Sequence, residues 1–194
     1  LSTSDEKAIK VESWLEEKLP GRNGRLIVGF GPGSKMQAKR WRIDNFWNVG
    51  QKLIKKYDIW PIVLGDSSDR STGDALVKSW KRGHNAAGEL SIAESHALLQ
   101  KCDLFIGNDT GTMHLAAAAN TPCVAIFSAR DVPGKWDPLG EGHAVLRKEV
   151  KCRQCMSVTC DDKICLMLIR PEEAAARADR ILLHAVKRKN GAFD

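Results

Sequence analysis

The residues best suited to bind an anion lie in the sequence GNDTGTMHLAAA, which begins at Gly107. A short apolar run precedes this sequence and a helix-forming run follows it, so its polar residues fall on a turn between a strand and a helix. The free backbone amides of a helix N-terminus and the helix dipole attract phosphate, which makes this turn a predicted phosphate site. Its candidate binding residues are Asp109, Thr110, Gly111 and His114.

A purely structural explanation of these residues is equally open. Asp109 or Thr110 could cap the helix through a side-chain oxygen, and His114 could lie satisfied beneath the sheet. Gly111 favours the binding interpretation, because a residue without a side chain lets a ligand approach the backbone closely. The turn taken alone does not decide between a cap and a binding site.

A second candidate loop has the sequence GPGSKMQAKRW and covers residues 31–41. It combines glycines with the hydroxyl of Ser34 and the ammonium groups of Lys35 and Lys39, which favours an anion site over a solvated loop. Its spacing fits neither the P-loop pattern G-x-x-x-x-G-K-[ST] nor the dinucleotide pattern G-x-G-x-x-G. The loop is therefore not a P-loop, and an NAD-dependent dehydrogenase is disfavoured.

A third polar turn, GDSSDR at residues 65–70, also follows an apolar run. Its carboxylates could bind a ribose or sugar hydroxyl, as acidic residues do in nucleotide sites. Asp69 could equally cap a helix, and for Asp66 the capping explanation carries slightly more weight. We expect Asp69 rather than Asp66 to face a ligand.

Four of the six cysteines follow the pattern C-x2-C-x4-C-x4-C, a spacing typical of metal ligands. Their thiolates could hold a structural zinc ion, form two disulfides, or stay reduced and pack against the final helix. The absence of a secretion signal argues against disulfides in the cell. Cys102 and Cys123 lie in or beside apolar segments and are predicted to be buried. The four clustered residues are Cys152, Cys155, Cys160 and Cys165.

Apolar segments and helix-forming segments alternate along the chain, which predicts an α/β fold: a Rossmann-like, doubly wound parallel sheet with helices on both faces. Ligands of such sheets bind beyond the carboxyl ends of the strands, which is where the three polar turns fall. Strands are expected at residues 25–30, 59–64, 103–106, 123–127 and 144–146, and helices at 1–19, 44–57, 74–80, 91–99, from 111 onward, and 171–189.

The chain has 194 residues, of which 43% are hydrophobic, and this size fits a single core. We expect an N-terminal helix and linker at residues 1–24, followed by a Rossmann-like domain at 25–194. This domain contains the cysteine-rich segment 152–165 and the C-terminal helix 171–189. The net charge of +6 favours anionic ligands or surfaces. The sequence shows neither a signal peptide nor a membrane-spanning run, so a cytoplasmic location is expected.

Taken together, the Gly-rich loop, the Gly-Asp turn, the sequence DTGTMHLAAA and the following PCVAIF resemble glycosyltransferase family 9, the heptosyltransferase-like enzymes. The resemblance extends from Arg25 to the final helix and includes the KWDP turn at residues 135–138. It implies a GT-B enzyme with two Rossmann-like domains, of which this chain is the C-terminal, donor-binding half. The general base would then lie in the N-terminal half, so no catalytic residue is expected in this chain.

The resemblance also assigns the donor-binding residues one by one. Ser34, Lys35 and Lys39 would face the donor diphosphate, and Asp69 would face the ribose of the nucleoside. Lys35 departs from the family pattern, in which a second hydroxyl residue often stands at its position. The residues that would face the diphosphate and the sugar are Asp109, Thr110, Gly111 and His114.

The implied partners are a nucleoside diphosphate sugar, with ADP-heptose as the family default, a glycan or lipid-linked acceptor such as lipopolysaccharide core, and the N-terminal half. No cofactor is required for this inverting transfer, and a structural zinc ion is the one metal that the cysteines suggest. A peripheral position at the inner face of the bacterial inner membrane is the alternative to a free cytoplasmic one.

Two other functions compete with this interpretation. The cysteine spacing equals that of a zinc knuckle with Cys160 in place of histidine, which would suggest a nucleic-acid-binding module. Asp161 and Asp162 repel phosphate and the segment lacks aromatic residues for base stacking, so we expect no nucleic acid partner. The second alternative is a nucleotide-binding domain without catalysis.

Overall fold

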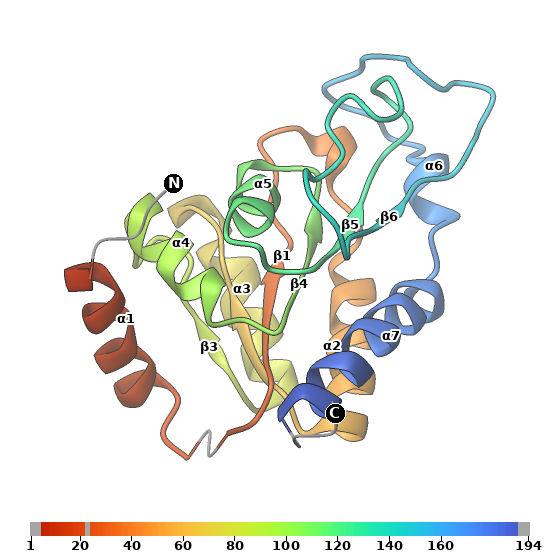
Figure 1. Ribbon diagram of the computed structural model, residues 1–194. Coiled ribbons are helices and arrows are strands. Elements are labelled where there is room, and N and C mark those ends of the chain that lie inside the picture. Colours follow the sequence, from red (N-terminus) through yellow and green to blue (C-terminus); the bar gives the residue numbers. More distant parts are fainter. Residues whose placement is uncertain (1–4, 22–23, 190–194) are drawn as a thin grey trace.

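The computed structural model describes residues 5–21 and 24–189, which form a six-stranded sheet in the order β3-β2-β1-β4-β5-β6 (Figure 1). Every neighbouring pair of strands is parallel, which confirms the predicted Rossmann-like α/β fold. The strands are β1 (Ile27–Gly31), β2 (Trp60–Val63), β3 (His84–Asn85), β4 (Leu104–Asn108), β5 (Cys123–Ile126) and β6 (Ala144–Leu146).

Helices cover both faces of the sheet (Figure 1). One face packs against α2, α3 and α7, and the other packs against α1, α4 and α5. The helices are α1 (Asp5–Lys18), α2 (Ile43–Tyr57), α3 (Arg70–Trp80), α4 (Ile92–Gln100), α5 (Gly111–Ala118), α6 (Ile164–Met167) and α7 (Pro171–Lys189). Two single 3-10 turns, η1 (Gln37–Lys39) and η2 (Ser67–Asp69), follow β1 and β2.

Successive residues of each strand point to opposite faces, and this alternation builds two separate cores. In β4, Leu104 and Ile106 face the core with α2 and α7, while Phe105 between them faces the core with α4 and α5. All three side chains are fully buried. Burial on both faces explains why the strands appear in the sequence as continuous apolar runs.

The helix α1 is packed tightly onto the sheet domain. Val11 and Leu15 of α1, together with Leu19 just after it, are buried in the same core as Leu98 and Leu99 of α4. The described part of the N-terminal segment therefore contributes to the core of the Rossmann-like domain.

Most predicted elements occur within a few residues of their expected positions, and the predicted C-terminal helix 171–189 coincides with α7. The capping box at the start of α4 is present, since Ser91 accepts from the Glu94 amide at 3.3 Å and Glu94 accepts from the Ser91 amide at 2.9 Å. The predicted cap of α2 by Asp44 is wrong, because the helix already begins at Ile43 and its N-cap makes no side-chain hydrogen bond.

The helix α3 begins at Arg70, four residues earlier than expected, because η2 leads directly into it. The elements β3, η1, η2 and α6 were not predicted, since each has only two to four residues and is too short to show a periodic pattern. Within residues 5–21 and 24–189, no helix is both long and apolar enough to cross a membrane.

Candidate functional site

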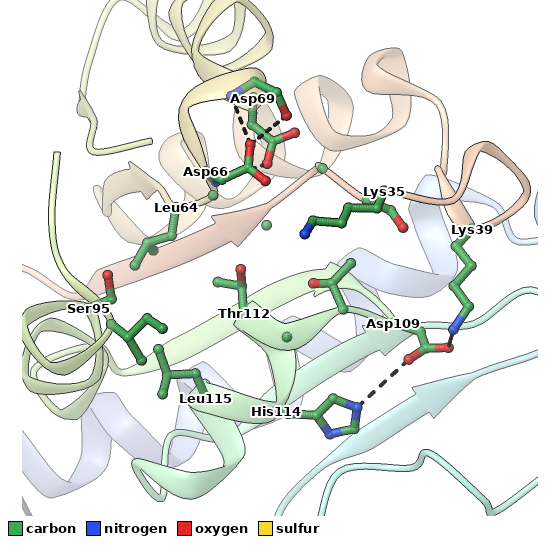
Figure 2. A pocket seen from close by; sticks show the side chains of 18 of the residues that line it. Lys35, Lys39, Leu64, Asp66, Asp69, Ser95, Asp109, Thr112, His114 and Leu115 are labelled. Atoms are coloured by element: carbon green, nitrogen blue, oxygen red, sulfur yellow. Dashed lines mark hydrogen bonds and ion pairs between the residues drawn. The ribbon is translucent and has the colours of Figure 1, made fainter. Parts of the chain in front are cut away.

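A cavity of about 860 Å³ lies over the carboxyl ends of β1, β2 and β4 (Figure 2). It occupies the position where the strand order reverses between β1 and β4, which is where doubly wound sheets bind ligands. All eight residues predicted to bind the donor line this one cavity, and they come from three separate turns. They are Ser34, Lys35, Lys39, Asp69, Asp109, Thr110, Gly111 and His114.

The loop after β1 is held against the sheet by Asn108, the last residue of β4. The Asn108 amide nitrogen donates to the carbonyl of Pro32 at 2.7 Å, and its oxygen accepts from the backbone amide of Trp41 at 3.1 Å. Asn108 is completely buried, so these hydrogen bonds are shielded from water. The loop that carries Lys39 is thereby fixed next to the turn that carries Asp109.

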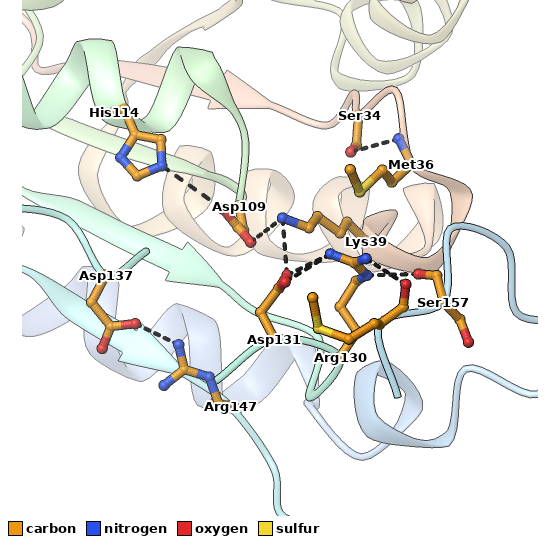
Figure 3. A network of polar contacts seen from close by, with 11 residues as sticks. Ser34, Met36, Lys39, Asp109, His114, Arg130, Asp131, Asp137, Arg147 and Ser157 are labelled. Atoms are coloured by element: carbon orange, nitrogen blue, oxygen red, sulfur yellow. Dashed lines mark hydrogen bonds and ion pairs between the residues drawn. The ribbon is translucent and has the colours of Figure 1, made fainter. Parts of the chain in front are cut away.

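The ammonium of Lys39 lies between two carboxylates (Figure 3). Its Nζ is 2.6 Å from Oδ2 of Asp109 and 3.2 Å from Oδ2 of Asp131. On the other side of Asp109, the Nε2 atom of His114 is 3.9 Å from Oδ1. Lys39 and His114 therefore lie on the same side of the molecule and share one carboxylate, as a common binding site requires.

Asp131 is stabilised in its charged form despite its burial. Burial raises the pKa of this carboxyl, but the hydrogen bond and charge of Lys39 and the charge of Arg130 outweigh burial and hold the pKa below its usual value. The guanidinium of Arg130 donates to both oxygens of Asp131, at 2.8 and 2.7 Å. Neither Arg130 nor Asp131 belongs to the motifs from which the site was predicted.

The structural explanation of the α5 turn is wrong for two of its residues. Asp109 pairs with Lys39 rather than capping the helix, and the His114 side chain is 41% exposed instead of lying beneath the sheet. Thr110 occupies the N-cap position of α5, yet its side chain makes no capping hydrogen bond. The amides at the start of α5 thus face the cavity without a side-chain cap from Thr110.

Gly111 opens directly onto the cavity. A Cβ atom built at this residue would meet no atom of the described chain within 4 Å. Packing within the protein therefore does not require a glycine here, whereas close approach of a ligand would require one.

Asp69 lies in a niche formed by two glycines. A Cβ atom at Gly33 or at Gly65 would overlap the Asp69 carboxylate, so these two positions must lack a side chain to accommodate it. Burial, and secondarily the nearby charge of Asp66, raise the pKa of Asp69. Asp69 also accepts from the amide of Asp66 at 3.2 Å in the capping box of η2, so capping and exposure to the cavity coexist in one residue.

Ser34 and Lys35 form the outer edge of the cavity. The hydroxyl of Ser34 accepts from the amide of Met36 at 3.2 Å and so stabilises the turn. The exposed side chain of Lys35 extends into the open space opposite Thr112 (Figure 2). An anion can therefore reach Lys35 from the solvent as well as from the cavity, whereas the buried Lys39 is accessible only from the cavity.

Comparison with known proteins identifies the family. The model of glycosyltransferase family 9 (heptosyltransferase) matches residues 3–165. The chain belongs to glycosyltransferase family 9. It is 28% identical over 167 residues to lipooligosaccharide heptosyltransferase 2 of Campylobacter jejuni, which covers 83% of this chain and 52% of that protein. It is 30% identical over 132 residues to lipopolysaccharide heptosyltransferase 2 of Escherichia coli, covering 63% of this chain and 36% of that protein.

The fold agrees with this family. The structure of Escherichia coli ADP-heptose LPS heptosyltransferase II superimposes with a TM-score of 0.77 at 24% identity, over 95% of this chain and 54% of that chain. The family 9 domain described here is thus one half of the heptosyltransferase GT-B fold. It spans about half the length, or less, of these three relatives.

Several residues that line the cavity were missed in the sequence. Trp136 contacts the ring of His114 edge-on, with ring centroids 6.4 Å apart, and belongs to the KWDP turn that the family resemblance includes. A tryptophan that follows a predicted strand was the available signal. The apolar residues of the cavity carry no polar motif and could not be distinguished from core residues; they are Leu64, Leu90, Ile92 and Leu115.

The four clustered cysteines lie at residues 152–165, which we call the cysteine loop; this segment is irregular up to Lys163, and Cys165 belongs to α6. All are free thiols, and only Cys165 packs against the core that includes α7. Among the described residues, no three His, Cys, Asp or Glu side chains are grouped closely enough to hold a metal ion. Zinc ligation by these thiols stays a prediction from their spacing. Cys102 and Cys123 are buried, as predicted.

Proposed function

We propose that this family 9 domain is the C-terminal, donor-binding half of an inverting glycosyltransferase and binds a nucleoside diphosphate sugar in the cavity. The observation that carries this proposal is the convergence of Lys39, Asp109 and His114, which come from turns after two different strands. Together with Lys35 and the open amides of α5, they form a site whose charges and size suit a diphosphate joined to a sugar.

The proposed chemistry follows from these groups. When an acceptor hydroxyl attacks the anomeric carbon from the opposite side, the bond to the diphosphate breaks and negative charge grows on the leaving phosphate oxygen. Lys35, Lys39 and the amides of α5 would stabilise that charge in the transition state. The proposed mechanism therefore needs neither a metal ion nor an organic cofactor for the transfer.

The remainder of the cavity suits a nucleoside. We assign the ribose to Asp69, which lines the cavity from the turn after β2. The apolar side chains of Leu64, Leu90 and Leu115 offer a surface against which a flat base can pack. We propose ADP-heptose as the donor, because the Escherichia coli relative with the same fold is an ADP-heptose enzyme by name.

The acceptor would be bound by the other half of the enzyme, and we propose a glycan of the lipopolysaccharide type, in keeping with the heptosyltransferase relatives. The general base would also come from that half. We therefore expect the chain alone to bind the donor without transferring its sugar. A cytoplasmic location, free or at the inner face of the inner membrane, belongs to this proposal.

A thermal unfolding panel tests the proposal on this chain. ADP, UDP, GDP, NAD and adenosine would each be added at equal concentration, because a ligand that binds the native state raises the melting temperature. The proposal predicts the largest shift with ADP and little with adenosine, which lacks the diphosphate. A shift with NAD alone, or none with any nucleoside diphosphate, would overturn it. As a control, the Lys55→Ala variant, altered at an exposed position of α2, should show the same shifts as the unaltered chain.

A further inference from the structure

Four charged side chains are buried beside the cavity, at its border with the cysteine loop. Lys39 and Arg130 are positive, Asp109 and Asp131 are negative, and each is at most 9% exposed. Burying four charges is costly unless each is paired and hydrogen-bonded. The pairing of these four side chains therefore indicates which of them stays free to contact a ligand.

Lys39 is held at two points and keeps a donor to spare. An ammonium has three N–H donors, and the carboxylates of Asp109 and Asp131 lie 2.6 and 3.2 Å from its nitrogen. Because Lys39 also lines the cavity, the remaining donor is the one available to a ligand. Two fixed contacts restrict the position of the nitrogen, so the lysine needs little reorganisation when an anion binds.

Arg130 fixes Asp131 in turn. Its guanidinium pairs with both oxygens of Asp131, and its Nε and Nη2 atoms donate to the carbonyls of Ser157 and Met156 at 2.6 and 2.7 Å. The Nη1 atom makes both contacts to Asp131, and the charge of Arg130 offsets part of the negative charge of Asp131, so Lys39 is not the only cation that balances this carboxylate. Both carbonyls belong to the cysteine loop, and Figure 3 shows the contact of Arg130 with Ser157.

The cysteine loop is also hydrogen-bonded to the segment that carries Lys39. The backbone amide of Ala38 donates to the carbonyl of Val158 at 3.0 Å, and the amide of Cys160 donates to the side-chain oxygen of Gln37 at 2.8 Å. The loop is therefore bonded both to η1, which ends in Lys39, and to Arg130. The hydrogen bonds of the cysteine loop therefore hold both the backbone next to Lys39 and the arginine that pairs with Asp131.

We propose that Asp131 and Arg130 are positioning residues for the donor diphosphate: they act through Lys39, and the backbone of the cysteine loop holds Arg130 in place. This inference rests on the proposed function, since it concerns the same cavity. It adds two residues outside the family motifs and gives the cysteine loop a role that does not depend on a metal ion.

The test is a double-mutant cycle measured by calorimetric titration of this chain with ADP and, separately, with adenosine. The variants are Asp131→Asn, Lys39→Met and the two combined. Loss of a charged hydrogen bond typically corresponds to about a tenfold change in binding, so Asp131→Asn should weaken ADP by about that factor. Adenosine binding should not change. In the Lys39→Met background, the further effect of Asp131→Asn should disappear.

Asp103→Asn is the matched control. Asp103 is likewise a shielded carboxylate paired with a lysine, since Lys189 lies 3.1 Å away, but it precedes β4 at the opposite end of the sheet. It should lower the melting temperature without changing the affinity for ADP. Arg130→Lys keeps the charge but lacks the separate Nε and Nη2 donors that bind the carbonyls of Ser157 and Met156. It replaces Asp131→Asn should that variant fail to fold, and it should weaken ADP severalfold.

The outcomes separate the two proposals. If the unaltered chain binds no nucleoside diphosphate, the proposed function fails and this inference fails with it. If the unaltered chain binds ADP but Asp131→Asn weakens ADP equally with and without Lys39, or weakens adenosine as much as ADP, the positioning role alone is overturned. An ADP-specific loss that vanishes in the Lys39→Met background supports it.

Discussion

The ammonium of Lys39 and the carboxylate of Asp109 lie 2.6 Å apart although 70 residues separate them in the chain. Parallel topology places the loop after β1 beside the turn after β4, and Asn108 fastens the two together. Buried ion pairs add little stability compared with well-packed apolar side chains. The pair is therefore better explained by the ligand that it would receive than by the fold that it helps to hold.

A substitution at Gly111 should affect ligand binding without affecting folding. Since a side chain here would meet no described atom within 4 Å, Gly111→Val should change the free energy of unfolding by no more than about 0.5 kcal/mol. The valine would occupy the space above the α5 amides, and ADP affinity should fall more than about tenfold, or 1.4 kcal/mol. Urea unfolding and calorimetric titration measure the two effects, with Gly111→Ala expected to lie between the wild type and the valine variant. Undiminished ADP binding by the valine variant would show that the ligand does not approach this turn.

Lys35 should contribute through charge alone, because its side chain is exposed at the edge of the cavity. Lys35→Ala is expected to leave stability unchanged and to weaken ADP binding by about threefold to tenfold at low salt, with a smaller effect at high salt, where screening is stronger. Titrations at two salt concentrations check this. Lys55→Ala removes the same charge from the exposed side of α2 and should have no effect; if the two variants behave alike, Lys35 has no specific role.

Asp69 and Asp131 should respond to pH in opposite directions. Burial raises the pKa of Asp69 above the usual 3.8, so its contribution to stability is present below that value and is lost as the pH rises through the higher folded-state pKa. Asp69→Asn should consequently be more stable than the wild type at pH 7, and the difference should disappear toward pH 3.

For Asp131 the folded-state pKa lies below the usual 3.8. Its contribution is present above that value and is lost as the pH falls through the lowered pKa. Asp131→Asn should be less stable than the wild type at pH 7, with a difference that shrinks in strong acid. Unfolding curves from pH 7 to pH 3 compare the two variants, and slopes of the same sign for both would contradict the assigned environments.

Cys155 should react faster with an alkylating reagent than Cys102, Cys123 and Cys152. Its side chain is exposed, and hydrogen bonds from the backbone and hydroxyl of Ser157 lower its pKa. Burial raises the pKa of Cys123 to about 12 and also raises that of Cys102. Limited alkylation with iodoacetamide at pH 7, read by mass spectrometry, should modify Cys155 before either buried thiol and faster than the exposed Cys152. Equal rates for Cys152 and Cys155 would contradict the proposed environment; denatured protein provides the control.

The sequence contained most of what determines the sheet and part of what determines the site. Strands buried on both faces form continuous apolar runs, and parallel strands bring their carboxyl ends together, so the convergence of Lys39 and Asp109 followed from general rules. The cap of α2 was misassigned to Asp44 because an acidic residue is favoured in the first turn of a helix as well as at the N-cap, and Asp44 lies in the first turn.

Arg130 and Asp131 could not be found in this way. Arg130 donates to the carbonyls of Met156 and Ser157 and also pairs with Asp131, and such contacts depend on the path of an irregular loop rather than on any periodic pattern. The apolar residues that line the cavity resemble core residues in the sequence, and only the fold distinguishes them. The motif residues that line the site could therefore be predicted from the sequence, whereas Arg130, Asp131 and the apolar lining residues could not.

The most direct measurement is a crystal structure of this chain with ADP bound. The account predicts that the phosphates lie over the N-terminus of α5, with a phosphate oxygen within hydrogen-bond distance of the Lys39 ammonium and the ribose beside Asp69. ADP bound away from this cavity, or bound within it with both phosphates turned from Lys39 and α5, would contradict the account.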